Sequence, residues 1–171
     1  MYLKVTEDNS LNKFSNFFKR GVFTPLFFSY ILSMKEKVFL SWNWVDQQVM
    51  TLGETIKESV SEFTYVSGIP RGGLIPGAYL SHYLGLKYIP YNEAKQLPIG
   101  FRRQVLVVDD ICDSGITLLE ASDFGFQTAA LAMRYSSPFI PEFYAEKIKT
   151  DDWLVFPWER DDSKTIQDYL A

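Results

Sequence analysis

The chain has 171 residues, 47% hydrophobic and 22% charged, an ordinary balance for one globular domain with a real core. Its net charge of −4 argues against a broad nucleic-acid surface and leaves room only for a local basic site. The single cysteine, Cys112, excludes an intrachain disulfide and a cysteine-rich zinc site. It suits a reducing compartment, so we expect a cytoplasmic protein.

The first 33 residues differ from the rest of the chain. An apolar run at 21–33, GVFTPLFFSYILS, is about as long as a signal-peptide core, but no small-x-small cleavage site follows it. The run is too short to span a bilayer, so we expect no integral membrane segment. Met34 then opens a stretch that reads like an ordinary protein start. Three readings stay open: an added arm that packs on the domain, a misplaced translation start, and a weakly membrane-associating segment.

Beyond this region, hydrophobic periodicity predicts strands that alternate with helices. Strands are expected at 38–40, 63–67, 87–90, 104–108 and 128–133. Helices are expected at 45–60, at 78–84, after the turn 114–117 to about residue 123, and at 161–170. Asn43 stands at the expected N-cap of the first helix, and Gly85 at the end of the second. The polar stretch 91–103, with Pro98 and Gly100, predicts a loop. This order predicts an α/β fold with a mainly parallel, twisted sheet flanked by helices.

The segment 105–117, VLVVDDICDSGIT, carries the strongest chemical signal. An apolar run leads into Asp109 and Asp110, and Asp113 follows just before the small turn Ser114–Thr117. Two carboxylates at a strand end can accept ribose hydroxyls, bind Mg²⁺, or do both. The turn opens a helix, where backbone N–H groups and two hydroxyls can converge on a phosphate. The alternative is a strand that ends in a solvated acidic turn, and the residues on both sides make it the weaker one.

A second loop, GIPRGGLIPG at 68–77, lies between a predicted strand and a predicted helix. Gly72 and Gly73 let the backbone approach a ligand closely, and Arg71 adds a fixed cation. A turn so rich in glycine and proline can also be purely structural. It is neither a Walker A loop nor a dinucleotide fingerprint, because no Gly-Lys-Ser/Thr follows and GxGxxG is absent.

Together, these two loops resemble those of the type I phosphoribosyltransferases. In that family, the acidic segment binds phosphoribosyl pyrophosphate (PRPP), and a loop similar to GIPRGG binds the leaving diphosphate. The resemblance also implies a non-proline cis peptide at Pro70–Arg71 or Arg71–Gly72. The residues that it implies for PRPP binding are Arg71, Gly72, Asp109, Asp110, Ile111, Cys112, Asp113, Ser114, Gly115, Ile116 and Thr117.

The tail narrows the resemblance to the xanthine–guanine phosphoribosyltransferases. TDDWLVFPWE at 150–159 is similar to their closing segment, in which an aromatic–aliphatic pair stacks on the purine, and Trp153 and Leu154 match this pair. The alternative is that the tryptophans fill the core of a small subdomain. Arg134 stands where those enzymes carry a lysine that donates to the purine 6-oxo group. This departure can change which bases fit.

The resemblance covers about residues 38–160 and implies the type I phosphoribosyltransferase fold. The domain would span 34–171, with a small hood at about 135–160 that contributes to the base site, and 1–33 would be an extension of uncertain status. The implied reaction transfers the phosphoribosyl group from PRPP to N9 of xanthine, guanine or hypoxanthine, as in purine salvage. It would involve no nucleic acid. The resemblance also implies a homo-oligomer, a dimer or a tetramer.

The family also implies roles for the three acids. Asp109 and Asp110 would hold the ribose hydroxyls, Asp110 would contact Mg²⁺, the implied cofactor, and Asp113 would take or share the N7 proton of the purine. Asp113 and Arg134 would face the base together with the stacking pair. Cys112 is expected to fill the loop and not to act as a nucleophile.

Two alternatives stay open. A PRPP- or nucleotide-sensing regulator of the same fold would keep the acidic segment and lose turnover, although the base-binding tail favours an enzyme. The same reaction on another base is the second alternative. The loop at 91–103 is shorter than the lid that this family closes over PRPP. Its cations Lys95, Arg102 and Arg103 do not match the lid residues securely.

Overall fold

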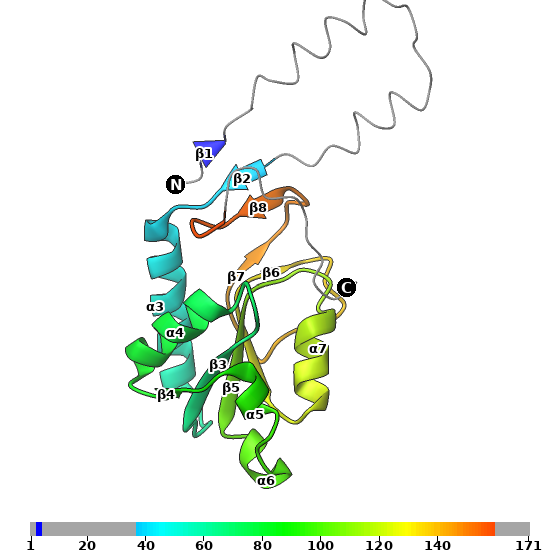
Figure 1. Cartoon of the computed structure of the whole chain (residues 1–171). Helices are drawn as coiled ribbons and strands as arrows, with labels where there is room; N and C mark the ends of the chain where they lie inside the picture. Colours follow the sequence, from blue (N-terminus) through cyan, green and yellow to red (C-terminus); the bar gives the residue numbers. More distant parts are fainter. Residues whose placement is uncertain (1–2, 5–36, 160–171) are drawn as a thin grey trace, which may run out of the picture. The chain divides into compact units, whose positions relative to one another are not determined.

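The computed structural model describes residues 3–4 and 37–159, which fall into two compact units (Figure 1). The larger unit contains Trp42–Thr150 and therefore both predicted ligand loops. The smaller one contains strand β1 (Leu3–Lys4) and the segments 37–41 and 151–159. The rest of the predicted N-terminal extension and the predicted helix at 161–170 lie outside the described residues. The division into an extension and a domain at 34–171 stays a prediction.

The larger unit is built on a five-stranded parallel sheet of order β4-β3-β5-β6-β7. Its strands are β3 (Tyr65–Gly68), β4 (Lys87–Tyr88), β5 (Val105–Cys112), β6 (Gln127–Arg134) and β7 (Phe143–Ile148). Strands β5 and β6 are buried over most of their length, as central strands covered on both faces must be. The predicted mainly parallel sheet is confirmed.

Helices cover both faces of this sheet (Figure 1). Helices α3 (Trp42–Glu58) and α4 (Leu74–Leu84) pack on one face, and α7 (Ile116–Asp123) packs on the other. The predicted end of α4 is confirmed, because Gly85 adopts a left-handed φ of 68° there. The predicted N-cap Asn43 is wrong, since α3 begins at Trp42 and so includes Asn43. The same helix ends before Val60, which is fully exposed.

The prediction of an irregular loop at 91–103 is wrong. Two one-turn helices, α5 (Tyr91–Ala94) and α6 (Ile99–Arg102), lie there, and each follows a proline. A fixed proline φ suits the start of a helix, so Pro98 initiates structure here and does not break it. Arg102 is also occupied, because its guanidinium donates to the carbonyl oxygens of Leu97 at 2.9 Å and Phe124 at 3.1 Å. It therefore holds α6 in place.

Strand β5 is four residues longer than the predicted 104–108 at its carboxyl end. Ladder pairing with β6 continues to Cys112, which lies opposite Met133. The acid pair Asp109 and Asp110 therefore lies on the strand itself, and only Asp113 and the residues after it form the turn.

The smaller unit is a three-stranded sheet of order β1-β2-β8. Strand β2 (Lys37–Phe39) pairs parallel with β8 (Trp153–Val155) and antiparallel with β1. The tail that we expected to form a hood from residue 135 is thus divided. Its strand β7 is the edge of the central sheet, whereas 151–159 belongs to the smaller unit.

Among the described residues, no helix is long and apolar enough to cross a membrane.

Candidate active site

The strand order defines where a ligand site belongs. From β3 the chain crosses to β4 on one side, and from β5 it crosses to β6 on the other. Strands β3 and β5 are neighbours, so the connections diverge at their carboxyl ends. A crevice at such a switch point is the usual ligand site of open α/β sheets. The loops 69–73 after β3 and 113–115 after β5, which lie within the predicted segments 68–77 and 105–117, begin at this point.

The glycine loop lies directly against β5. Ile69 donates its N–H to the carbonyl oxygen of Val108 at 2.9 Å, and a β-carbon on Gly73 would lie 2.1 Å from that same oxygen. A β-carbon on Gly72 would lie 2.5 Å from Oδ2 of Asp110. The two glycines are therefore required for the close approach of this loop to β5. That they also let the backbone approach a ligand stays a prediction. The peptide bond Pro70–Arg71 is cis, which confirms one of the two expected positions.

The acid pair is held by the backbone of its own strand. Asp109 accepts the N–H of Asp110 at 3.0 Å, and Asp110 accepts the N–H of Ile111 at 2.7 Å. Burial, and then the neighbouring charge of Asp110, raise the pKa of Asp109, against the opposing hydrogen bond from the Asp110 N–H. Two adjacent carboxylates in such surroundings are stabilised by ligand hydroxyls or by a cation.

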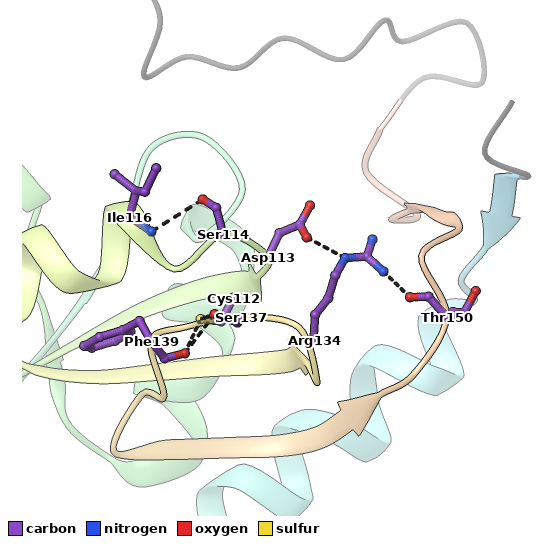
Figure 2. A network of polar contacts seen from close by, with 8 residues as sticks. All are labelled: Cys112, Asp113, Ser114, Ile116, Arg134, Ser137, Phe139 and Thr150. Carbon is purple, nitrogen blue, oxygen red and sulfur yellow. Dashed lines mark hydrogen bonds and ion pairs between the residues drawn. The ribbon is translucent and has the colours of Figure 1, made fainter. Parts of the chain in front are cut away.

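The turn after β5 has the shape of a phosphate site. Gly115 has a φ of 75° and caps the N-terminus of α7. Its α-carbon is also crowded, because a β-carbon would lie 2.5 Å from Cβ of Phe139 and 2.9 Å from Oγ of Ser137. Ser114 is exposed, and its Oγ accepts a hydrogen bond from the N–H of Ile116 at 3.5 Å (Figure 2). The first backbone N–H groups of a helix have no intrahelical partner, so this turn can accept an anion.

Cys112 contacts Ser137 and Phe139, the two residues that lie against Gly115 in the turn. Its side chain is buried, with Sγ 3.4 Å from Oγ of Ser137 and 3.5 Å from the carbonyl oxygen of Phe139 (Figure 2). Burial is the main cause that raises the pKa of its thiol. A buried thiol with a raised pKa is a poor nucleophile, in line with the expectation for this residue. The bracing residues Ser137 and Phe139 carry no local sequence signal that predicts this contact.

Asp113 and Arg134, both predicted at the base, are in contact. Nε of Arg134 lies 2.6 Å from Oδ1 of Asp113, and its Nη1 donates to the carbonyl oxygen of Thr150 (Figure 2). The Arg134 side chain is 4% exposed and that of Asp113 is 50% exposed, so the carboxylate is the accessible partner. The sequence did not indicate Thr150, because any residue supplies a carbonyl oxygen.

Three further residues are predicted to bind substrate, Arg71, Trp153 and Leu154. Arg71 is exposed at the tip of the glycine loop. Trp153 and Leu154 belong to the smaller unit, where Leu154 is buried opposite Val38 and Trp153 is half-buried. Their stacking on a base is an expectation from the resemblance alone.

Solved structures with the same architecture identify the class. The purine phosphoribosyltransferase from Pyrococcus horikoshii matches with a TM-score of 0.60 and 29% identity, over 77% of this chain and 99% of that one. The xanthine-guanine-hypoxanthine phosphoribosyltransferase of Helicobacter pylori shares the fold, with a TM-score of 0.61 and 19% identity over 74% and 95% of the two chains. The switch-point site with its two loops is thus set in a type I phosphoribosyltransferase fold.

Sequence relatives narrow the class. The xanthine-guanine phosphoribosyltransferase of Cereibacter sphaeroides is 31% identical over 114 residues, which cover 55% of this chain and 68% of that protein. That of Gluconobacter oxydans is 26% identical over 140 residues, or 70% and 83% of the two chains. No protein-family model matches the chain. Its sequence similarity to these relatives shows that the chain belongs to the xanthine–guanine phosphoribosyltransferase family.

Proposed function

We propose that this protein transfers the 5-phosphoribosyl group of PRPP to N9 of a 6-oxopurine, with release of diphosphate and the nucleoside monophosphate. The contact between the glycine loop and the acid pair carries this proposal. The backbone of Gly72 lies against the Asp110 carboxylate, and the turn at Gly115 opens α7 on the same sheet edge. A ligand that fills both loops has vicinal hydroxyls between two phosphorylated ends, as PRPP has.

Each residue then has a role in a balanced reaction. The bond between C1′ and the diphosphate oxygen breaks, its electron pair leaves with diphosphate, and the N9–C1′ bond forms. Asp109 and Asp110 hold the ribose hydroxyls, and the backbone from Ile111 to Thr117 holds the 5′-phosphate. Arg71 and Gly72 bind the diphosphate. The purine loses one proton, which Asp113 takes or shares.

The residues fit the Mg²⁺ ion that this family implies. The part of the chain that the structure describes contains no group of three or more histidine, cysteine or acidic residues that could hold a metal unaided. Mg²⁺ commonly uses one or two carboxylates, together with substrate phosphates and water. Asp110, next to Asp109, would therefore hold it only together with PRPP, and the ion would supply charge neutralisation for the departing diphosphate.

The base site favours a 6-oxopurine. Asp113 offers an acceptor and Arg134 a donor, the complement of an N7–H group and a 6-oxo group on one purine edge. A 6-amino group would place a second donor against the guanidinium. Trp153 and Leu154 are proposed to cover the faces of the ring. The preferred base is xanthine, guanine or hypoxanthine, and the protein would act in the cytoplasm as a homo-oligomer.

Diphosphate release tests the proposal. The protein is incubated with PRPP and Mg²⁺ and, in separate reactions, with guanine, xanthine, hypoxanthine, adenine or orotate. We expect release with at least one 6-oxopurine, and none in the absence of a base. An Asp110→Asn variant is the matched control, because it keeps the side-chain volume and loses the charge. PRPP binding without release for any base would contradict the proposal and favour a sensing regulator.

A further inference from the structure

Arg134 is held in one position from two directions. It is the last residue of β6, where it pairs with Ile148 of β7, and the preceding Met133 pairs with Cys112 of β5. Its backbone is therefore fixed by strands on both sides. Its guanidinium is then fixed by the carboxylate of Asp113 and the carbonyl oxygen of Thr150 (Figure 2).

These contacts require an arginine. A guanidinium is planar and spreads its charge over three nitrogens, so Nη1 can donate to the carbonyl oxygen of Thr150 while Nε stays within ion-pair distance of the Asp113 carboxylate. A lysine ammonium is a single point charge on a flexible stem and cannot fix two acceptors relative to each other. The side chain is only 4% exposed, and a buried charge is tolerated only when it is paired and hydrogen-bonded. Arg134 is therefore confined to this arrangement.

The two acceptors that hold Arg134 are the Asp113 carboxylate and the carbonyl oxygen of Thr150. Asp113 is the proposed proton acceptor at the purine, and Thr150 immediately precedes the segment 151–159, which carries Trp153 and Leu154. We infer that Arg134 is a positioning residue that fixes the Asp113 carboxylate relative to the carbonyl oxygen of Thr150 and so determines how strictly the site selects purines. This inference rests on the proposed function and adds to it a role that a lysine at position 134 could not perform.

The conservative variant Arg134→Lys tests the inference directly. It keeps the charge and can still donate to a 6-oxo group, but its three donors rotate on a flexible stem and do not hold two acceptors in one fixed geometry. We expect kcat/KM for the preferred 6-oxopurine to fall about tenfold or more, and its ratio to that for adenine to shrink by a similar factor. The KM for PRPP should stay within about twofold, because the phosphate loops are unchanged. Unchanged kcat/KM and unchanged selectivity would overturn the inference.

Two further variants separate positioning from general damage. Gly100→Ala, whose β-carbon would meet nothing within 4 Å, is the control for substitution outside the site, and we expect wild-type kinetics within about twofold. In an Asp113→Asn background, Arg134→Lys should have little further effect if the arginine acts through Asp113. Multiplying effects would contradict the inference.

Folding is checked by thermal denaturation of every variant. If Arg134→Lys gives no cooperative transition, Asp113→Glu decides, because it keeps the arginine and moves the carboxylate by one methylene. It should lose selectivity in the same way, and retained selectivity would overturn the inference. A wild-type protein without activity on any base would instead refute the proposed function, so the two failures can be told apart.

Discussion

Gly72 and Asp110 are in such close contact that a β-carbon on the glycine would lie 2.5 Å from Oδ2 of the carboxylate. Gly72 lies in the loop after β3, whereas Asp110 lies on β5 itself, the neighbouring strand in the sheet. The diphosphate loop and the ribose-binding acids are therefore one structural unit. A change in either residue must disturb the other.

Gly72→Ala should weaken PRPP binding by about tenfold or more, because the added methyl group must displace the Asp110 carboxylate or the glycine loop. Titration calorimetry with PRPP and Mg²⁺ measures this. The matched control is Gly100→Ala, whose β-carbon would meet nothing within 4 Å. The control should bind PRPP like the wild type, and equal binding by both variants would show that the contact is unimportant.

Gly115→Ala should destabilise the protein by about 2–4 kcal/mol. It combines an unfavourable φ of 75° with a β-carbon that would lie 2.5 Å from Cβ of Phe139. Gly85→Ala isolates the first effect, since Gly85 has a φ of 68° and an added β-carbon there would meet nothing within 4 Å. It should cost only about 1–2 kcal/mol. Chemical denaturation gives both values, and equal losses would mean that the turn adapts without cost.

Asp109→Asn should stabilise the ligand-free protein at neutral pH and weaken PRPP binding. The pKa of Asp109 is raised by burial and by Asp110. The folded state therefore holds the proton of Asp109 more tightly than the unfolded state, in which the pKa of an aspartate is about 3.9. The free energy of unfolding therefore falls as pH rises from that value through the raised pKa, and the loss persists above it.

Melting temperatures measured across pH test this sign. The advantage of Asp109→Asn over the wild type should grow with pH and then level off. An advantage that shrinks as pH rises would contradict the assignment.

Cys112→Ala should retain turnover within about threefold, and the folded protein should resist alkylation. The thiol is buried, and its raised pKa leaves little thiolate at neutral pH. Labelling with iodoacetamide, followed by mass spectrometry, measures its accessibility, and the denatured protein is the positive control. Rapid labelling of the folded protein, prevented by PRPP, would place the thiol in the site.

The ligand loops could be predicted from the sequence because their signals are local. Asp109, Asp110 and Asp113 lie within five residues, and Gly72 and Gly73 are adjacent. The carboxyl-terminal extension of β5 was missed, because its last four residues form strand only through pairing with β6. The bracing of Gly115 by Ser137 and Phe139, and that of Arg134 by Thr150, depend on contacts between distant segments. No periodicity or motif reports such contacts.

The two helices at 91–103 show a different limit. Pro90 and Pro98 can end one element or begin the next, and local propensity does not decide between these outcomes. Packing decides here, since Ala94 is fully buried and Arg102 donates to the carbonyl oxygens of Leu97 and Phe124. A residue that looks like a lid cation in sequence is therefore a structural donor.

The formation of a nucleoside monophosphate from PRPP and a free base tests the central claim most directly. We would mix the wild-type protein with PRPP, Mg²⁺ and one base, which is guanine, xanthine or hypoxanthine. The products are then separated, and mass spectrometry identifies and quantifies them. We predict the 5′-monophosphate of at least one 6-oxopurine, in equal amount to diphosphate and far in excess of any adenine product. PRPP binding without a nucleotide product for any of these bases would contradict the claim.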